Sequence, residues 1–163
     1  MVSKDTLLAH IEYSAWASRR LIEAAAELPE SDLQRDFGTA DKSILGTLVH
    51  LYRADKLWLA RMHRAADKIV LADSDFQVSV LRDKWPEIYA GWRHYLAGLT
   101  DEQILESISY HDLKGNAWST PIYQIVLHLV NHGTHHRGQA SGFLRSLGHK
   151  PPVLDLIAYY RSL

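Results

Sequence analysis

The sequence predicts an all-α protein built as a four-helix bundle. Four long segments repeat apolar residues at intervals of three and four, the spacing of one face of a helix. The connections between them are compatible with antiparallel neighbours, and no internal repeat or low-complexity stretch is visible. A chain of 163 residues has the length of one ordinary domain, so we expect residues 1–163 to form a single helical bundle domain.

The first three long helices are expected over residues 5–28, 43–66 and 81–98. Pro29 marks the end of the first, and the stretch LPESDLQRDFGTADKS that follows is typical of a loop. In the third, Pro86 favours a start near Lys84, because proline is best tolerated in the first turn of a helix. Three tryptophans at helical spacing are expected in the core: Trp58, Trp85 and Trp92.

Two smaller elements accompany the long helices. Residues 104–120 change character, and the segments ISY and AWST on either side of KGN indicate a hairpin-like excursion. A short C-terminal helix is expected over residues 154–162, after the KPPV stretch.

The fourth long helix lies between these two elements. We expect it to begin with Ser119 or Thr120 as the N-cap and Pro121 in the first turn. It continues to Leu147, where Gly148 provides a C-terminal stop.

Composition excludes several classes of function. The net charge of −1 gives no support to a nucleic-acid or anionic-membrane partner. Because the chain has no cysteine, any metal must be held by nitrogen and oxygen, and any thiol chemistry must use the thiol of a substrate. The first ten residues lack the apolar core of a signal peptide, and no window has the length of a membrane span, so a cytoplasmic location is expected.

Histidines concentrate in the fourth long helix. The segment HLVNHGTHHRGQ, residues 128–139, contains four of the ten histidines in the chain. On a helical wheel His132 and His136 point with the apolar residues, whereas His128 and His135 lie on the shoulder of that stripe. A single histidine on an apolar face is usually a hydrogen-bonded core residue, but several together are costly to bury. Two imidazoles at positions i and i+4 can bind one metal ion, so the pattern predicts a metal site.

A stable metal site needs at least one further ligand from another helix. The segment lacks the glutamate of HExxH, and no ExxH pair is present, which disfavours zinc-protease and ferritin-like arrangements. His50 is the best candidate because it lies within the second long helix, on the edge of its apolar stripe. His63 lies among arginines near the end of that helix and is expected to be solvated. The remaining candidates are His10 and His94.

The chain resembles the DinB/YfiT-like family of proposed metalloenzymes along nearly its whole length. The segment HLVNHGTHHRGQASGFLRSLGHKPPVLDLIAYYR is similar to the C-terminal signature of that family. KSILGTLVHLYRADKLWLARM resembles its second helix, and EYSAWASRRLIEAA its first. The resemblance implies a four-helix bundle in which three histidines, His50, His132 and His136, hold a divalent metal, with zinc or nickel the most common ions. It also implies a homodimer.

The resemblance leaves two kinds of function open. Some relatives transfer low-molecular-weight thiols to electrophiles, which implies a metal-dependent thiol transferase here. Three neutral imidazoles with an open coordination position would suit that chemistry, and would equally suit a metal-dependent hydrolase. The alternative is a stress-related metal-binding protein in which the ion is structural and nothing is turned over.

Other polar residues near this pattern have open roles. Asp55 falls on the apolar stripe of the second helix, where it could pair with a buried arginine or orient a ligand histidine. Arg137 is expected in a surface salt bridge, with binding of a substrate carboxylate as the alternative. His128 and His135 could line the rim of the site or face solvent.

Overall fold

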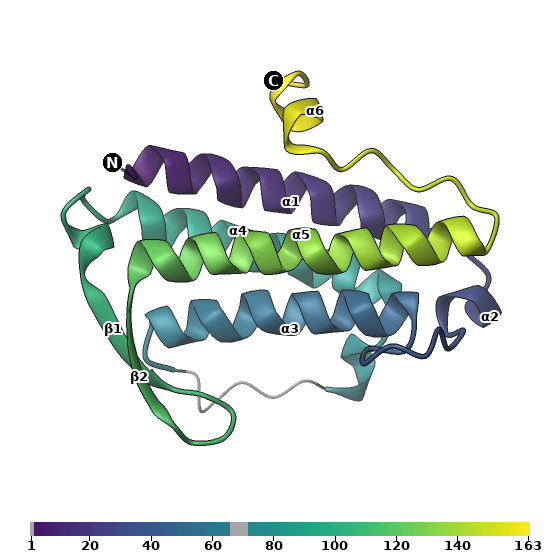
Figure 1. Ribbon diagram of the computed structural model, residues 1–163, viewed down its shortest axis with the longest axis horizontal. Helices are drawn as coiled ribbons and strands as arrows, with labels where there is room; N and C mark the ends of the chain where they lie inside the picture. The colour runs from purple at the N-terminus through teal and green to yellow at the C-terminus, as the bar shows by residue number, and fades with distance from the viewer. Residues whose placement is uncertain (1, 66–71) are drawn as a thin grey trace.

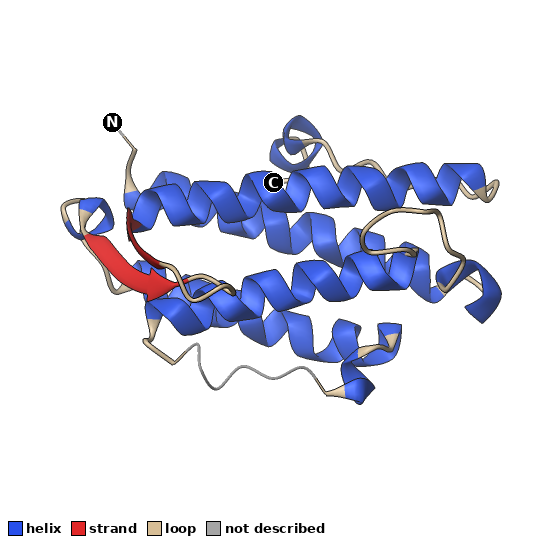
Figure 2. Ribbon diagram, turned by 60° about the horizontal axis from the view of Figure 1, so that its bottom comes forward, coloured by secondary structure: helices blue, strands red, loops and turns tan. Residues whose placement is uncertain are grey.

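The computed structural model describes residues 2–65 and 72–163. Four long helices pack along their lengths, and a two-stranded hairpin lies at one end of the bundle (Figures 1 and 2). The predicted all-α class, with four long helices and one small hairpin, is confirmed. The long helices are α1 (Lys4–Ala26), α3 (Ile44–Met62), α4 (Val78–Ala97) and α5 (Ile122–Ser146).

The four long helices enclose one core. α1 packs against α4 and α5, and α3 packs against the same two helices. α3 and α4 run in the same direction, since Tyr52 contacts Trp85 in the first half of each helix and Leu59 closely approaches Gly91 in the second half of each. The connections therefore do not all join antiparallel neighbours, which differs from the expectation. No helix in the described part of the chain combines the length and apolarity needed to cross a membrane.

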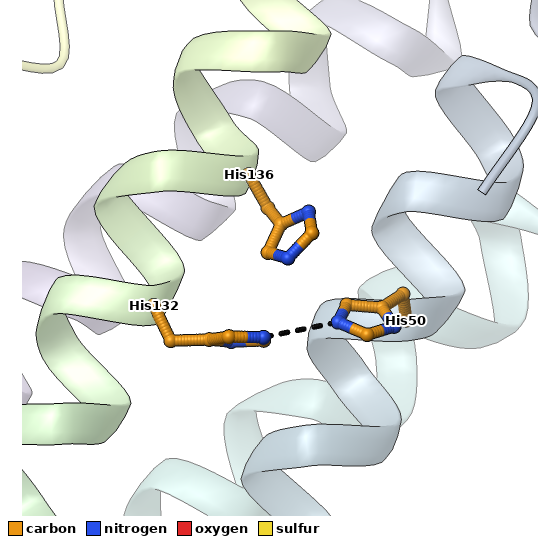
Figure 3. A group of neighbouring side chains, drawn as sticks. All are labelled: His50, His132 and His136. Carbon is orange, nitrogen blue, oxygen red and sulfur yellow. Dashed lines mark hydrogen bonds between the residues drawn. The ribbon is translucent and has the colours of Figure 1, made fainter. Parts of the chain in front are cut away.

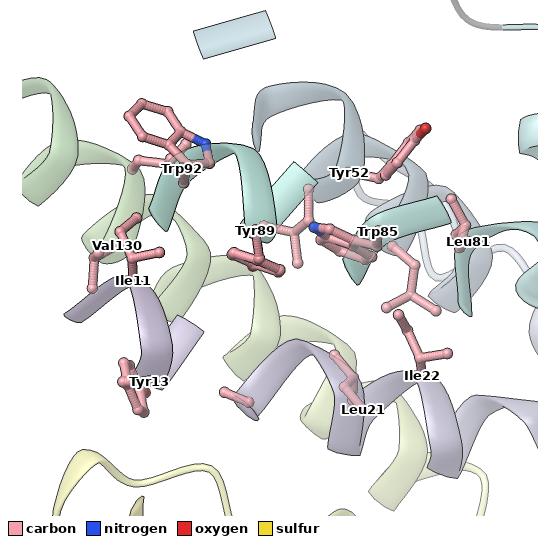
Figure 4. Packing of buried hydrophobic residues seen from close by; sticks show 14 of the residues in the cluster. Ile11, Tyr13, Leu21, Ile22, Tyr52, Leu81, Trp85, Tyr89, Trp92 and Val130 are labelled. Carbon is pink, nitrogen blue, oxygen red and sulfur yellow. The ribbon is translucent and has the colours of Figure 1, made fainter. Parts of the chain in front are cut away.

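Large apolar side chains fill the space between the helices (Figure 4). Trp85 and Trp92 of α4 are fully buried, as expected, and the indole nitrogens of both donate hydrogen bonds to Asp55 of α3. Trp58 departs from the expectation because it is only partly buried. Its ring lies against Tyr110 of the hairpin and His128 of α5, at the edge of the bundle rather than in its core.

The boundaries of α1 and α3 follow their capping residues. Ser3 caps α1 by accepting from the backbone N–H of Thr6, and the helix ends before Pro29 as predicted. Ser43 caps α3 in the same way, accepting from Gly46. α3 ends at Met62, earlier than the expected end at Ala66, which itself lies outside the described residues. The segment predicted as a loop contains one short helix, α2 (Glu30–Leu33).

The predicted start of the third long helix near Lys84 is wrong. α4 begins at Val78, so Pro86 lies in the helix interior. Proline there removes the hydrogen bond to the carbonyl of Arg82, four residues earlier. Arg82 and Pro86 are both exposed, so water can satisfy that carbonyl, while burial of Val78 and Leu81 stabilises the additional turn.

The predicted hairpin is confirmed, and it also determines where the last long helix begins. β1 (Ser107–His111) pairs antiparallel with β2 (Ala117–Pro121), and Ser119 and Thr120 are held extended by this pairing. Neither can therefore serve as the expected N-cap of α5, and Pro121 occupies that position without a side-chain hydrogen bond. Instead, the N–H of Ile122 donates to the carbonyl of Glu106 at 3.0 Å.

The C-terminal features agree with the sequence. α5 ends at Ser146, and Gly148 adopts a φ of +85°, a left-handed conformation that favours glycine at a helix end. The chain then runs back along the bundle to the short helix α6 (Leu156–Tyr160), which packs on α1 (Figure 1). Two short 3₁₀ turns complete the described elements, at Asp73–Asp75 and Gln103–Leu105.

Candidate metal centre

Three histidines from two helices converge on one point. His132 and His136 lie one turn apart on α5 and face α3, where His50 points back toward them (Figure 3). One ring nitrogen from each can be chosen so that all three lie within 4.8 Å of one another. The structure thus brings together the three residues named from the sequence, and the group could hold a metal ion.

The spacing of two of these nitrogens suits a shared ion. The Nε2 atoms of His50 and His132 are 3.0 Å apart. Two imidazole nitrogens bound to one tetrahedral zinc, each ~2.0–2.1 Å from it, would be roughly 3.3 Å apart. All three side chains are partly buried, and imidazole is a ligand that zinc, nickel, copper and iron all accept.

The carboxylate of Asp41 contacts two of the three rings from behind. Its Oδ1 is 3.3 Å from Nδ1 of His50, and its Oδ2 is 3.4 Å from Nδ1 of His136. Nδ1 of His136 is buried and makes no other hydrogen bond within the described residues. The carboxylate of Asp41 is therefore placed to receive its proton. A proton on each Nδ1 leaves both Nε2 lone pairs free for a metal, which is how outer carboxylates orient ligand histidines.

Asp41 was missed by the sequence reasoning. It lies in the irregular stretch between α2 and α3, where no periodicity indicates the direction of a side chain. Its backbone carbonyl accepts from the N–H of Ser43, the residue that caps α3. This hydrogen bond ties the residue that carries the carboxylate to the N-cap of the helix that carries His50. The only sign of this role in the sequence is an aspartate two residues before the N-cap serine of that helix.

The environment keeps the α5 histidines neutral. Burial, reinforced by the neighbouring imidazoles of His136 and His50, lowers the pKa of His132 to about 4. Burial also lowers the pKa of His136, with His50 adding to the effect. Metal ligation requires unprotonated imidazole, so both rings are in the binding form at neutral pH without first losing a proton.

The other candidate third ligands lie outside the cluster. His10 contacts the backbone carbonyl of Thr6 within its own helix, and His63 lies edge-on to Tyr95. His94 is exposed near the end of α4. His128 and His135 are exposed beside the cluster, with ring centroids 5.7 Å from His132 and 5.0 Å from His136 respectively.

Asp55 and Arg137 are buried away from the three histidines. Asp55 accepts from the indole nitrogen of Trp85 at 2.7 Å. Among the described residues it forms no ion pair with an arginine and no hydrogen bond to a ligand histidine. Burial raises its pKa to about 6. The expected surface salt bridge of Arg137 is wrong, because this side chain is only 2% exposed and lies over the ring of Tyr13. It borders a separate groove between α5 and the chain after Gly148.

A cleft opens beside the three histidines. It has a volume of about 600 Å³ and lies between α3, α5 and the hairpin. His50 and His132 form part of its wall, so a small molecule in the cleft can reach the nitrogens that face each other there. Other lining residues come from α3 and the hairpin, including Arg53, Trp58, Lys114 and Trp118.

Known proteins share both this sequence pattern and this fold. The sequence model described as the DinB family matches residues 1–162. The chain belongs to the DinB family. Protein DinB of Bacillus subtilis strain 168 is 24% identical over 156 residues, covering 91% of this chain and 90% of that protein. The crystal structure of a DinB-like protein from Bacillus cereus ATCC 10987 superposes with a TM-score of 0.69 at 17% identity, covering 91% of this chain and 95% of that one.

Proposed function

We propose that this DinB family protein binds a divalent metal through His50, His132 and His136 and uses it to transfer a small thiol to an electrophile. The observation that carries the proposal is the convergence of three imidazole nitrogens at the wall of an open cleft. In the described part of the chain, the cluster holds these three side chains and no fourth ligand. Such an incomplete ligand set is the arrangement of catalytic rather than closed structural sites.

An ion at this position supplies a Lewis acid that makes a thiol or a water molecule more acidic. The thiol has to come from a substrate, because the chain contains no cysteine. With a chlorinated aromatic as the electrophile, a sulfur–carbon bond forms and the carbon–chlorine bond breaks. Chloride leaves with the bonding electrons, and the proton of the thiol passes to solvent.

The residues of the chain have defined tasks in this proposal. Asp41 keeps protons on Nδ1 of His50 and His136, so that the opposite nitrogens hold the ion. Zinc or nickel is the expected ion, because the family resemblance implies these two among the metals that accept a purely nitrogenous ligand set. Elemental analysis of protein purified without an affinity tag would test this expectation. A preparation carrying neither metal above background would contradict it.

The activity is tested by incubating metal-loaded protein with several cellular thiols and 1-chloro-2,4-dinitrobenzene. We expect conjugation that depends on the ion and falls to background in His50→Gln. The matched control is His63→Gln, which removes an exposed histidine from the C-terminal end of the same helix and should leave the rate unchanged. Absence of metal-dependent conjugation with every thiol tested would contradict the proposal.

A structural role for the ion is the alternative that one observation favours. The three histidines belong to α3 and α5, so an ion held by them would cross-link two long helices. Under this alternative, metal removal lowers the melting temperature strongly and no substrate is converted. Under the enzymatic proposal the metal-free protein stays folded, because the buried core of tryptophan, leucine and isoleucine side chains is independent of the ion. Assaying ester hydrolysis in the same preparations would separate a hydrolase from a thiol transferase.

A further inference from the structure

The cleft beside the three histidines contains cationic side chains that have no partner within residues 2–65 and 72–163. Arg53 and Lys114 line the cleft and are exposed, and neither side chain makes a hydrogen bond or ion pair in those residues. Arg53 lies three residues after His50, so both project from the same side of α3. Lys114 lies opposite, in the hairpin turn. Positive charge therefore borders the approach to the histidines.

The carboxylate that lines this cleft, Asp112, forms no ion pair with Arg53 or Lys114 among the described residues. Asp112 uses Oδ1 to accept the backbone N–H groups of Lys114 and Asn116. Its Oδ2 accepts the side-chain N–H groups of Asn116 and Trp118. These bonds hold the pKa of Asp112 well below its usual range, so it is ionised and committed to shaping the turn. Within the described residues, the side chains of Arg53 and Lys114 therefore remain available to an incoming anion.

The third cation of the cleft has a structural role. Arg61 is largely buried, donates to the backbone carbonyl of His111 at 2.9 Å, and lies over the rings of Trp58 and Tyr110. It fixes the hairpin to the end of α3 and adds one more positive charge behind the aromatic wall. Among the described residues, the cleft thus has three cationic side chains against one carboxylate.

Exposed apolar side chains line the same cleft as Arg53 and Lys114. Trp118 is 54% exposed and Leu113 is 75% exposed, and both border the cleft together with Leu57 of α3. Apolar surface beside unpaired charge suits a ligand that has a short carbon skeleton and an acidic group. A neutral, fully polar ligand would leave both features unused.

We propose that the thiol substrate of this protein is an acidic one, a small thiol whose carboxylate is held by Arg53 and Lys114 while its sulfur reaches the three histidines. This inference rests on the proposed function and adds the chemical class of the substrate. Arg53 and Lys114 are positioned to bind the carboxylate and do not take part in the bond-making step.

The test compares two small thiols, the anionic mercaptosuccinate and the neutral 1-thioglycerol. Cobalt(II)-loaded protein is titrated with each, and binding is followed by the sulfur-to-cobalt charge-transfer absorption. We expect mercaptosuccinate to bind at least tenfold more tightly than 1-thioglycerol. Sodium chloride should weaken mercaptosuccinate binding and leave 1-thioglycerol unaffected, because only the former depends on charge.

Variants that remove one positive charge distinguish binding in the cleft from a general effect of the protein's charge. Arg53→Gln and Lys114→Gln should each weaken mercaptosuccinate binding a few-fold, and the double variant about tenfold, with no effect on 1-thioglycerol. Lys150→Gln removes the same charge in the separate groove behind α5 and should change neither affinity. Equal affinities of the two thiols, or equal effects of the three single variants, would overturn this inference and leave thiol transfer intact. Absence of the absorption with both thiols would overturn the proposed function itself.

Discussion

The backbone carbonyl of Asp41 lies so close to Gly46 that a Cβ atom added to the glycine would stand 1.9 Å from the oxygen. No side chain can be accommodated at that distance, so glycine allows the loop before α3 to fold against the first turn of the helix. The same loop places the Asp41 carboxylate behind His50 and His136. A backbone contact in the first turn of α3 thus determines the position of a carboxylate at the candidate metal centre.

Gly46→Ala should therefore impair metal binding without removing any ligand. The added methyl group displaces the Asp41 carbonyl and, with it, the carboxylate. We expect the zinc affinity, measured by calorimetry, to fall by up to about 10- to 100-fold, the usual effect of losing an outer-sphere partner. Gly138→Ala on α5 is the control, because a Cβ added at that position would meet no atom within 4 Å. Wild-type affinity in Gly46→Ala would show that the carboxylate does not depend on this contact.

Asp41→Asn tests the carboxylate itself. The amide preserves the size of the side chain but loses the charge that favours a proton on each Nδ1. Zinc affinity should fall by about 10- to 100-fold, while the melting temperature of the metal-free protein changes little. Asp83→Asn removes an exposed carboxylate from α4 and should leave the zinc affinity unchanged. If both variants bind zinc as tightly as the wild type, Asp41 has no part in the site.

The stability of the metal-free protein should decrease in mild acid because of His132. Burial and the neighbouring imidazoles lower the pKa of this residue from 6.5 to about 4. Between these values the unfolded chain binds a proton that the folded protein does not, so the free energy of unfolding falls as the pH drops. His132→Gln should lose less stability than the wild type between pH 7 and pH 4.5, as measured by urea unfolding. Parallel pH profiles for the two proteins would contradict the assignment.

Asp55 should produce the opposite dependence. Burial raises its pKa from 3.8 to about 6, so the folded protein retains a proton that the unfolded chain has released. This residue therefore makes the protein less stable as the pH rises through that interval, by on the order of 1.4 kcal/mol for each pH unit between the two pKa values. Asp55→Asn keeps an oxygen for the indole of Trp85 and should gain stability relative to the wild type between pH 4 and pH 7, as measured by urea unfolding. A stability difference that is constant with pH would rule out this role.

The helices and two of the three candidate ligands followed from periodicity. His132 and His136 share one face of one helix, and a face can be read from spacing because it is a local property of the chain. His50 required a choice among histidines on other helices, which the family resemblance made and spacing alone left open. The wrong helix starts, at Lys84 and at Ser119 or Thr120, both arise where a local propensity is overridden by tertiary burial or strand pairing.

The sequence by itself determined the helical class, the stripe of histidines on the last long helix and the absence of any thiolate ligand. Tertiary structure alone decided that Asp41 stands behind two of the rings, that Arg137 is buried, and that Arg53 and Lys114 border the same cleft. Helical periodicity extends along a single element, so it indicates which side chains share a face. The packing of α3 against α5, and the return of a loop and a hairpin onto them, depends on contacts between residues far apart in the chain, and no local pattern encodes those distances.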